Sequence, residues 1–227
     1  MRSYLFVPGD SPRKAEKSLE SGADAVILDL EDSVAPSAKE EARRVTAAFL
    51  AERTGRAGGP RLLVRVNAFS TGLTDADLDA VMPSAPDGIV LPKSVGGQDI
   101  ARLGVKIAVR EAEYGLADGA TRILAIATES GRAVFGLGTY GGSSHRWGAE
   151  DLSADLGAET NREEDGRPTA PYRLVRDLTL FGAAAAEVDA VDAVFPNFRD
   201  LEGLRRECLE ARRDGFVSKM AIHPAQV

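Results

Sequence analysis

The chain has 227 residues, of which 44% are hydrophobic and 28% charged, and its net charge at pH 7 is −7. This composition is typical of a globular protein with a buried core, and the negative charge disfavours a nucleic-acid or membrane-surface role. No apolar run approaches the roughly 18 residues of a membrane span, and residues 1–10 lack the apolar segment of a signal peptide. We therefore expect a cytoplasmic enzyme without a nucleic-acid or membrane partner.

Short apolar segments alternate with helical segments along most of the chain. We predict strands at residues 4–8, 25–30, 61–67, 88–93, 122–129, 146–151, 193–198 and 216–222. We predict helices at residues 13–20, 38–52, 101–114, 174–188 and 202–214, and a polar loop over 157–172. Such alternation predicts a parallel sheet with helices outside it.

Eight strands of this kind predict an α/β protein with the (β/α)₈ (TIM) barrel fold, which typically takes about 250 residues. We expect one catalytic domain over residues 1–227. A doubly wound sheet is the alternative, but its glycine-rich nucleotide-binding motif does not follow the first strand. The chain stops soon after the eighth predicted strand, so we expect a further C-terminal segment that is missing here.

Two helix starts carry capping signals. Ser11 followed by Pro12 has the pattern of an N-cap and a first helical residue. Ser37 and Glu40 have the spacing of a capping box.

The run A-V-I-L-D-L-E-D at residues 25–32 organises the remaining argument. It begins as the apolar strand of a buried parallel sheet and ends with three acids within four residues. Burying a charge is costly unless the charge is paired or binds a metal. The acids therefore indicate a site at the end of this strand.

Charged residues also end the neighbouring predicted strands, where a barrel of this class carries its catalytic groups. These strand-end residues are Glu31, Arg65, Lys93, Glu129 and Asp151. Carboxylates brought together repel one another unless a cation joins them. Oxygen ligands suit Mg²⁺ or Mn²⁺, and the near absence of histidine and cysteine argues against zinc.

Some of these acids have an alternative interpretation. Asp32 and Asp151 could cap the helices that follow them. Glu129 is poorly placed to be a cap, because alternation puts Ala125 and Ala127 on its face, so that small residues lie beneath the acid.

The two basic residues also have alternatives. Arg65 could be a structural ion-pair partner for Asp29 or Glu31, or it could recognise a substrate carboxylate through two hydrogen bonds. Lys93 could be a solvated strand end or a lysine that forms a Schiff base.

Several motifs together resemble a known family. They are R-S-Y-L-F-V-P-G, V-I-L-D-L-E-D-S-V, V-R-V-N, I-V-L-P-K, A-T-E-S, G-A-E-D-L-S-A-D-L-G and G-F-V-S-K-M-A-I-H-P-A-Q-V, in this order along the chain. The chain resembles the citrate lyase β-subunit-like family, within the HpcH/HpaI aldolase/citrate lyase superfamily.

The resemblance implies a Mg²⁺-dependent lyase that makes or breaks a carbon–carbon bond. Its substrates would be 3-hydroxyacyl thioesters of coenzyme A or acyl carrier protein, of the citryl-, malyl- or citramalyl-CoA type. The products would be a keto acid such as oxaloacetate, glyoxylate or pyruvate and an acyl thioester. In several relatives a C-terminal segment crosses to a neighbouring subunit, so we also expect a homotrimer.

The family's site residues carry over by position. Glu129 and Asp151 match the Mg²⁺ ligands, and Glu31 matches an acid that contacts the metal through water. Arg65 matches the arginine that binds the keto-acid carboxylate, helped by the backbone around Gly148–Ala149. Two alternatives stay open: a metal-dependent aldolase of free hydroxy-keto acids, and a non-catalytic subunit that binds a keto acid or thioester.

Overall fold

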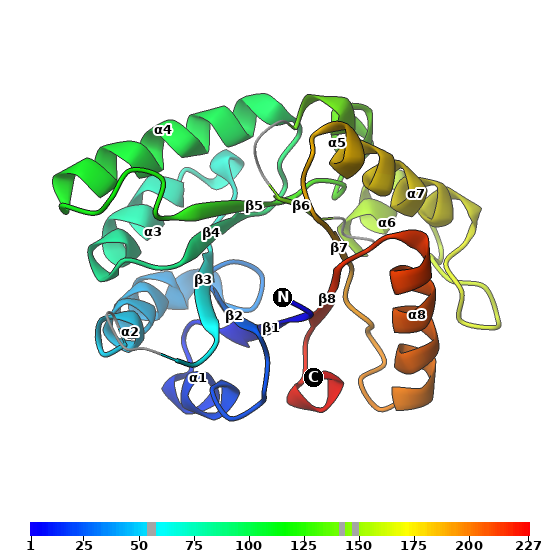
Figure 1. Ribbon diagram of the computed structural model, residues 1–227, viewed down its shortest axis with the longest axis horizontal. Coiled ribbons are helices and arrows are strands. Elements are labelled where there is room, and N and C mark those ends of the chain that lie inside the picture. The colour runs from blue at the N-terminus through cyan, green and yellow to red at the C-terminus, as the bar shows by residue number, and fades with distance from the viewer. Residues whose placement is uncertain (54–57, 141–143, 147–149) are drawn as a thin grey trace.

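A computed structural model describes residues 1–53, 58–140, 144–146 and 150–227. In these residues a central sheet of parallel strands lies inside a layer of helices (Figure 1). The strands are β1 (Ser3–Pro8), β2 (Ala25–Asp29), β3 (Arg61–Arg65), β4 (Gly88–Leu91), β5 (Arg122–Ile126), β6 (Ser144–Arg146), β7 (Ala190–Asp192) and β8 (Ser218–Ala221). They pair in chain order, and β8 pairs with β1, so that the ring of pairings closes.

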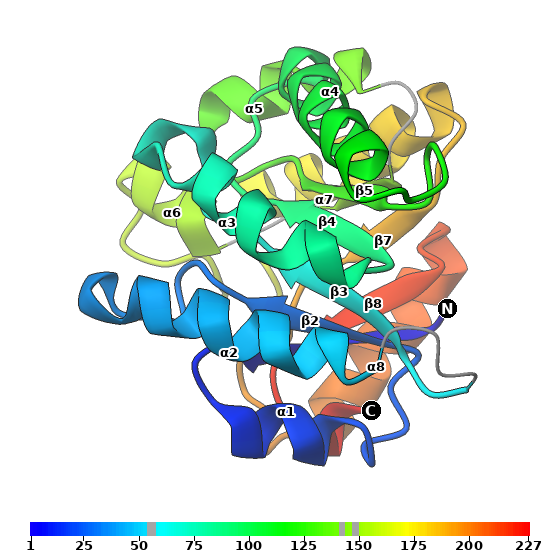
Figure 2. The ribbon, with the colours of Figure 1, turned by 90° about the vertical axis from the view of Figure 1, so that its left-hand side faces the viewer.

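Helices follow the strands along the chain. They are α1 (Pro12–Ser18), α2 (Lys39–Ala51), α3 (Thr74–Val81), α4 (Gly97–Glu113), α5 (Gly131–Phe135), α6 (Glu150–Leu156), α7 (Ala170–Ala185) and α8 (Leu201–Asp214). Figure 2 shows α1 to α4 stacked in chain order along one side of the sheet. Short 3₁₀ helices lie at Pro36–Ala38, Phe69–Thr71, Met82–Ser84, Leu137–Thr139 and Pro224–Gln226. None of the described helices combines the length and apolar character needed to cross a membrane.

The strand pairing is uneven around the ring. The β1–β2 and β2–β3 ladders each join five residue pairs, whereas β6–β7 and β7–β8 each join two. The predicted α/β class with a parallel sheet is confirmed. Its regular part runs from β1 to β5, where the sequence has long apolar runs.

Alternation along the strands produces two apolar layers. One cluster lies inside the ring and consists of Tyr4, Ala25, Ile27, Leu63, Val90, Leu124, Ile126, Val191 and Met220. The intervening strand residues pack outward against the helices, in a cluster that includes Val26, Leu28, Val64, Leu91, Leu50, Leu78 and Leu103. Because successive side chains point to opposite faces, a strand buried on both sides is apolar throughout, as β2 is up to Leu28.

Two strand predictions were wrong in position. The sixth strand was placed at residues 146–151, but β6 ends at Arg146 and α6 begins at Glu150. The seventh was placed at residues 193–198, but β7 is Ala190–Asp192. Both strands are short and carry polar residues, so the apolar run that marks a buried strand does not delimit them.

The capping predictions had mixed outcomes. Ser11 is the N-cap of α1 with Pro12 as its first residue, although the Ser11 side chain accepts no capping hydrogen bond. The Ser37/Glu40 capping box was wrong, because Ser37 lies within the 3₁₀ helix Pro36–Ala38 and Ala38 is the N-cap of α2. Helices α3, α5 and α6 were not predicted.

A buried charge network joins β7 and β8 to the helices outside them. Lys219 on β8 donates to Asp192 on β7 at 2.8 Å and to Glu207 on α8 at 2.7 Å. Arg176 on α7 donates to the same Asp192 at 3.1 Å. Both cations pair with Asp192, so its removal would leave two buried positive charges with less negative charge beside them.

We therefore expect Asp192→Ala to lower the free energy of unfolding by about 3–5 kcal/mol, the usual cost of breaking a buried ion pair. Asp189→Ala is the matched control: Asp189 is exposed, so its removal should cost less than about 0.5 kcal/mol. Urea denaturation followed by circular dichroism measures both. Equal losses would show that the network does not stabilise this side of the sheet.

Candidate functional site

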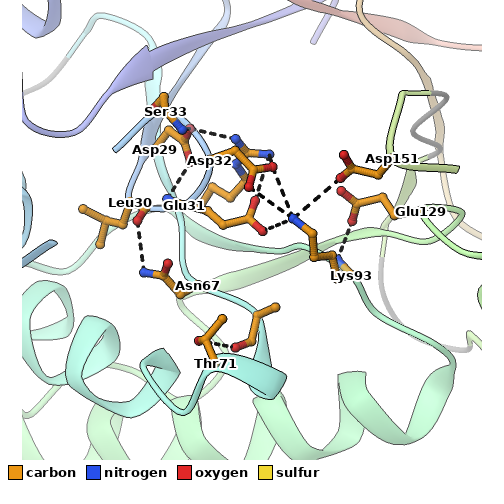
Figure 3. A network of polar contacts seen from close by, with 12 residues as sticks. Asp29, Leu30, Glu31, Asp32, Ser33, Asn67, Thr71, Lys93, Glu129 and Asp151 are labelled. Carbon is orange, nitrogen blue, oxygen red and sulfur yellow. Dashed lines mark hydrogen bonds and ion pairs between the residues drawn. The ribbon is translucent and has the colours of Figure 1, made fainter. Parts of the chain in front are cut away.

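Acidic and basic side chains gather where β2 to β5 end. Figure 3 shows Lys93 between Glu31 on one side and Glu129 and Asp151 on the other. A cavity of about 420 Å³ adjoins this cluster. Its polar lining includes Asp29, Asp32, Arg65, Glu129 and Asp151, and its apolar lining includes Phe6, Ile126, Val194, Met220 and Ile222. The cavity thus has an apolar wall and a charged wall, as small-molecule sites commonly do.

A second cavity, of about 520 Å³, lies between α7 and α8 and is lined by Arg162, Arg176, Glu207 and Asp214, among others. Its charged groups are largely engaged with one another: Arg176 pairs with Asp214 at 2.8 Å, and Arg162 lies 3.6 Å from Glu207. We place the candidate site at the smaller cavity, because more acidic than basic side chains line it.

Arg65 at the end of β3 forms a two-hydrogen-bond ion pair with Asp29 at the end of β2. Its Nε donates to Oδ1 at 2.6 Å and its Nη2 to Oδ2 at 2.7 Å. Asp29 also accepts from the backbone N–H groups of Glu31 and Ser33, at 2.9 and 3.1 Å. Burial alone would raise the pKa of Asp29, but its hydrogen bonds and the charge of Arg65 hold that pKa below its usual value. Asp29 is therefore ionised, and the ion pair orders the turn after β2.

Glu31 has a less complete set of partners. Its Oε1 accepts from the Nζ of Lys93. Its Oε2 is buried without a hydrogen-bond partner, 3.1 Å from Nη1 of Arg65. Burial raises the pKa of Glu31 despite the nearby charges of Arg65 and Lys93. A buried oxygen that accepts no hydrogen bond costs free energy. A further donor to this oxygen, such as a metal-bound water, would therefore be favourable.

Lys93 follows β4 with a positive φ of 51°. A non-glycine residue in this left-handed region costs on the order of 1–3 kcal/mol and persists where its surroundings enforce it. Here the backbone N–H of Lys93 donates to Oε2 of Glu129, so the unusual conformation directs a donor at the acid.

Glu129 and Asp151 form the centre of the cluster. Glu129 is buried, 7% exposed. Burial raises its pKa well above the usual value, and the hydrogen bond and negative charge of Asp151 raise it further. The same hydrogen bond lowers the pKa of Asp151. The two carboxyl groups therefore titrate as a coupled pair, in which Glu129 keeps its proton to higher pH than Asp151 does.

These acids fit a hard divalent cation. A cation beside Glu129 and Asp151 would remove the repulsion between their ionised carboxylates. Among the described residues no group of three or more His, Cys, Asp or Glu side chains is arranged to hold a metal. Two carboxylates suffice for Mg²⁺, which keeps several waters and is usually bound through one or two carboxylates.

The structure brings together all five strand-end residues predicted from the sequence: Glu31, Arg65, Lys93, Glu129 and Asp151. Asp151 arrives from α6 rather than from a strand end. Gly148 and Ala149 lie outside the described residues.

The prediction that Ala125 and Ala127 lie on the same face as Glu129 was wrong. Ala125 and Ala127 belong to the cluster packed against the helices, while Leu124 and Ile126 face the interior. Strand β5 ends at Ile126, so strand alternation does not extend to Glu129. The turn after the strand brings this acid to the site.

Two supporting residues were not assigned a role from the sequence. Lys39 on α2 donates to the backbone carbonyls of Leu30 and Glu31, both at 2.7 Å. Asn67 donates to the carbonyl of Leu30 at 3.0 Å and to the buried Asp77 at 2.7 Å. The alternation that places Asn67 on the face of Arg65 was a usable signal. Lys39 lies in a separate helix, where its position after the V-I-L-D-L-E-D-S-V motif belongs to the family resemblance but strand alternation gives no signal.

The comparisons with known proteins agree with this geometry. The family model for HpcH/HpaI aldolase/citrate lyase matches residues 2–224. This chain belongs to that family. A citrate lyase subunit beta-like protein of Mycobacterium tuberculosis is 34% identical over 99% of this chain and 75% of its own length. The mitochondrial citramalyl-CoA lyase of Rattus norvegicus is 30% identical over 100% of this chain and 69% of its own.

Solved structures of this family are also similar. The M. tuberculosis protein CitE in complex with magnesium and acetoacetate has a TM-score of 0.84 and 31% identity, covering 100% of this chain and 87% of that one. The citrate lyase beta subunit from the same organism, complexed with oxaloacetate and magnesium, has a TM-score of 0.79 and 32% identity, covering 99% and 92%. The resemblance to citrate lyase β subunits is thereby confirmed.

The raised pKa of Glu129 predicts how stability depends on pH without a divalent ion. Glu129 has a raised pKa in the folded chain, so ionising it costs more there than in the unfolded chain, and stability falls as the pH rises above its ordinary pKa of about 4.5. Glu129→Gln removes this loss. In EDTA we expect its Tm to gain on the parent between pH 4.5 and 8, by roughly 2–4 °C per kcal/mol removed.

The lowered pKa of Asp151 has the opposite effect on stability. Its largest cause is the hydrogen bond with Glu129, and the amide of the Glu129→Gln variant can still donate to Asp151, so this effect largely cancels in the comparison. Glu164→Gln, at an exposed position, is the control and should track the parent at every pH. Differential scanning calorimetry measures the three proteins. A Glu129→Gln difference that stays constant across this pH range would contradict a raised pKa of Glu129.

Proposed function

We propose that this protein is a Mg²⁺-dependent carbon–carbon lyase that acts on a 3-hydroxyacyl thioester of the citryl-, malyl- or citramalyl-CoA type. The products would be a keto acid, such as oxaloacetate, glyoxylate or pyruvate, and an acyl thioester. The observation that carries the proposal is the adjacent carboxyl pair Glu129 and Asp151, which lines the same cavity as Arg65. The lyase names of the family and of the relatives support the reaction class.

In this proposal Glu129 and Asp151 hold Mg²⁺, and Glu31 contacts the metal through water. Oε2 of Glu31 accepts no hydrogen bond although it lies 3.1 Å from Nη1 of Arg65, which supports that indirect role. Solved relatives contain magnesium together with a keto acid. When bound, the metal would act as a Lewis acid that stabilises negative charge on a substrate oxygen.

Arg65 would bind the carboxylate of the keto acid. Asp29 occupies its Nε and one N–H of Nη2. Oε2 of Glu31 lies 3.1 Å from Nη1 without accepting a hydrogen bond, so Nη1 and the second N–H of Nη2 can donate to a substrate carboxylate. Asp29 thus fixes the guanidinium in advance, so little side-chain entropy remains to be lost on binding. The backbone at Gly148–Ala149 would add donors to the same carboxylate.

In the cleavage direction the bond between the carbinol carbon and the carbon next to the thioester breaks. The hydroxyl proton leaves to a base, the carbinol becomes the keto group, and the electron pair forms a thioester enolate that then takes up a proton. Arg65 would hold the acid end of the substrate so that the breaking bond stays oriented. The cavity's apolar wall would exclude water from the enolate.

We also propose that residues 1–227 form a single (β/α)₈ barrel domain, in the cytoplasm, and that the protein is a homotrimer. Phe135 on α5 is 95% exposed and Leu156 on the adjacent α6 is 51% exposed. Exposed apolar groups of this size suit an interface.

Sedimentation equilibrium should give three times the chain mass, and Phe135→Asp should shift the protein toward monomer. A parent that is monomeric at micromolar concentration would refute the trimer.

A substrate panel tests the reaction directly. The protein with Mg²⁺ should cleave at least one of citryl-CoA, malyl-CoA and citramalyl-CoA, with the keto acid quantified by chromatography. Cleavage of free hydroxy-keto acids without a thioester would instead identify a free-acid aldolase. Binding of coenzyme A thioesters without turnover would identify a non-catalytic subunit.

The roles of two residues can be separated by calorimetry. Glu129→Gln should weaken Mg²⁺ binding and abolish turnover, because an amide is a weaker ligand for a hard cation than a carboxylate. Arg65→Lys should keep Mg²⁺ binding but weaken oxaloacetate or pyruvate binding by roughly 10–100-fold, the effect of losing a charged hydrogen bond of about 1.5–3 kcal/mol.

Asp29→Asn is the control for Arg65, because it loosens the structural ion pair while the guanidinium remains. It should lower stability and leave keto-acid binding closer to that of the parent than Arg65→Lys does. Parent-like Mg²⁺ affinity in Glu129→Gln would remove this residue from the metal site.

Lys93 should not form a covalent intermediate. A Schiff base requires a neutral amine, but the carboxylates of Glu31, Glu129 and Asp32 raise the pKa of Lys93 despite its partial burial. Incubation with pyruvate and borohydride should leave the protein mass unchanged by mass spectrometry. A stable adduct on Lys93 would replace the metal-based mechanism with a Schiff-base one.

A further inference from the structure

The ammonium group of Lys93 lies among three acids that come from different parts of the chain. Its Nζ pairs with Oε1 of Glu31, and it lies 3.2 Å from Oδ2 of Asp32 and 3.6 Å from Oδ2 of Asp151. Glu31 and Asp32 follow β2, whereas Asp151 belongs to α6. Lys93 therefore connects two sides of the cavity through its charge (Figure 3).

The balance of acidic and basic groups around the cavity shows what the Lys93 charge contributes. Arg65 is engaged mainly with Asp29. Its Nη1 also lies 3.1 Å from Glu31 and 3.9 Å from Asp32. In the described part of the chain, Lys93 is the cation that pairs with Asp151 as well as with Glu31 and Asp32. A divalent ion on Glu129 and Asp151 would enter a cluster that already contains this positive charge. Two cations this close in a partly buried site repel each other.

We propose that Lys93 is the resident counter-cation of the acid cluster and competes with Mg²⁺ for it. This inference rests on the Mg²⁺ site of the proposed function and adds a positioning residue to it. Without Mg²⁺, the ammonium group holds Glu31, Asp32 and Asp151 together. With Mg²⁺ bound, it withdraws from Asp151 and keeps its contact with Glu31.

The exposure of the side chains in contact supports an exchange of this kind. The Lys93 side chain is 37% exposed and that of Asp151 is 40% exposed, whereas Glu31 is 6% exposed. The ammonium group is therefore anchored on a buried partner and meets Asp151 at the solvent side. The four-carbon stem of lysine allows a shift of this size by rotation of side-chain bonds.

The backbone of Lys93 is fixed independently of its ammonium group. Its N–H donates to Oε2 of Glu129, and this bond orients one proposed metal ligand. Exchange of the ammonium group therefore leaves Glu129 in place. The residue has two separable parts: a backbone donor that positions Glu129, and a charge that occupies the cluster until the metal arrives.

Removal of the charge should have two effects of opposite sign. Lys93→Met should destabilise the metal-free protein, because the acids lose their counter-cation. It should also tighten Mg²⁺ binding by about tenfold, because the competing charge is gone. A residue with a merely structural role would lower stability with or without Mg²⁺ and would not tighten its binding.

The experiment is a calorimetric titration of Mg²⁺ into full-length protein, combined with thermal unfolding in EDTA and in saturating Mg²⁺. Lys39→Met is the matched control. It removes the same charge beside the cluster, but Lys39 contacts the carbonyls of Leu30 and Glu31 rather than carboxylates. It should lower Tm in both conditions and change the Kd for Mg²⁺ by less than about threefold. Lys93→Arg keeps the charge and should restore the metal-free Tm toward that of the parent.

The expected result for Lys93→Met is a lower Tm in EDTA, a Tm close to that of the parent in saturating Mg²⁺, and a Kd for Mg²⁺ lowered about tenfold. An unchanged or raised Kd would overturn the proposal, as would equal Tm losses in both conditions. Lys93→Gly, which suits the positive φ, serves as the second charge-removing variant if Lys93→Met does not fold. If the parent fails to bind Mg²⁺, both this inference and the proposed function are overturned; if the parent binds and the variants do not bind more tightly, this inference alone fails.

Discussion

The ion pair between Arg65 and Asp29 is the interaction on which the charged end of the sheet depends. It joins β3 to β2 above an apolar interior, where a lone charge would be unfavourable. Asp29 also accepts hydrogen bonds from the backbone of the following turn. The pair therefore holds Glu31 near Arg65, and Glu31 in turn anchors Lys93. Loss of this pair would disturb the whole cluster and not one contact.

The fold was predictable where local signals are strong. Residues in β1 to β5 form apolar runs whose boundaries lie close to the predicted ones, because a strand buried on both faces needs apolar side chains throughout. The signal fails at β6 and β7. Asp192 is buried within β7 but is neutralised by Lys219 and Arg176, and pairing with residues distant in sequence cannot be read from a local pattern.

The candidate site was likewise predictable only in part. The sequence predicted which charged residues meet, because parallel strands end at one edge of the sheet. It did not predict how the chain turns after each strand. Lys93 reaches Glu129 through a left-handed backbone conformation, and Asp151 arrives on a helix. Neither follows from alternation, which describes a strand only as long as the strand continues.

The uneven ladder around the ring has a consequence for motion. Glu129 follows β5, which pairs with β4 over four residues, whereas Asp151 follows β6, which pairs with β7 over two. Short ladders open more readily, so amide hydrogens near β6 and β7 should exchange with solvent faster than those of β1 to β5. An ion shared by Glu129 and Asp151 would then link a rigid half of the sheet to a looser half, and ligand occupancy would slow hydrogen exchange on the looser side.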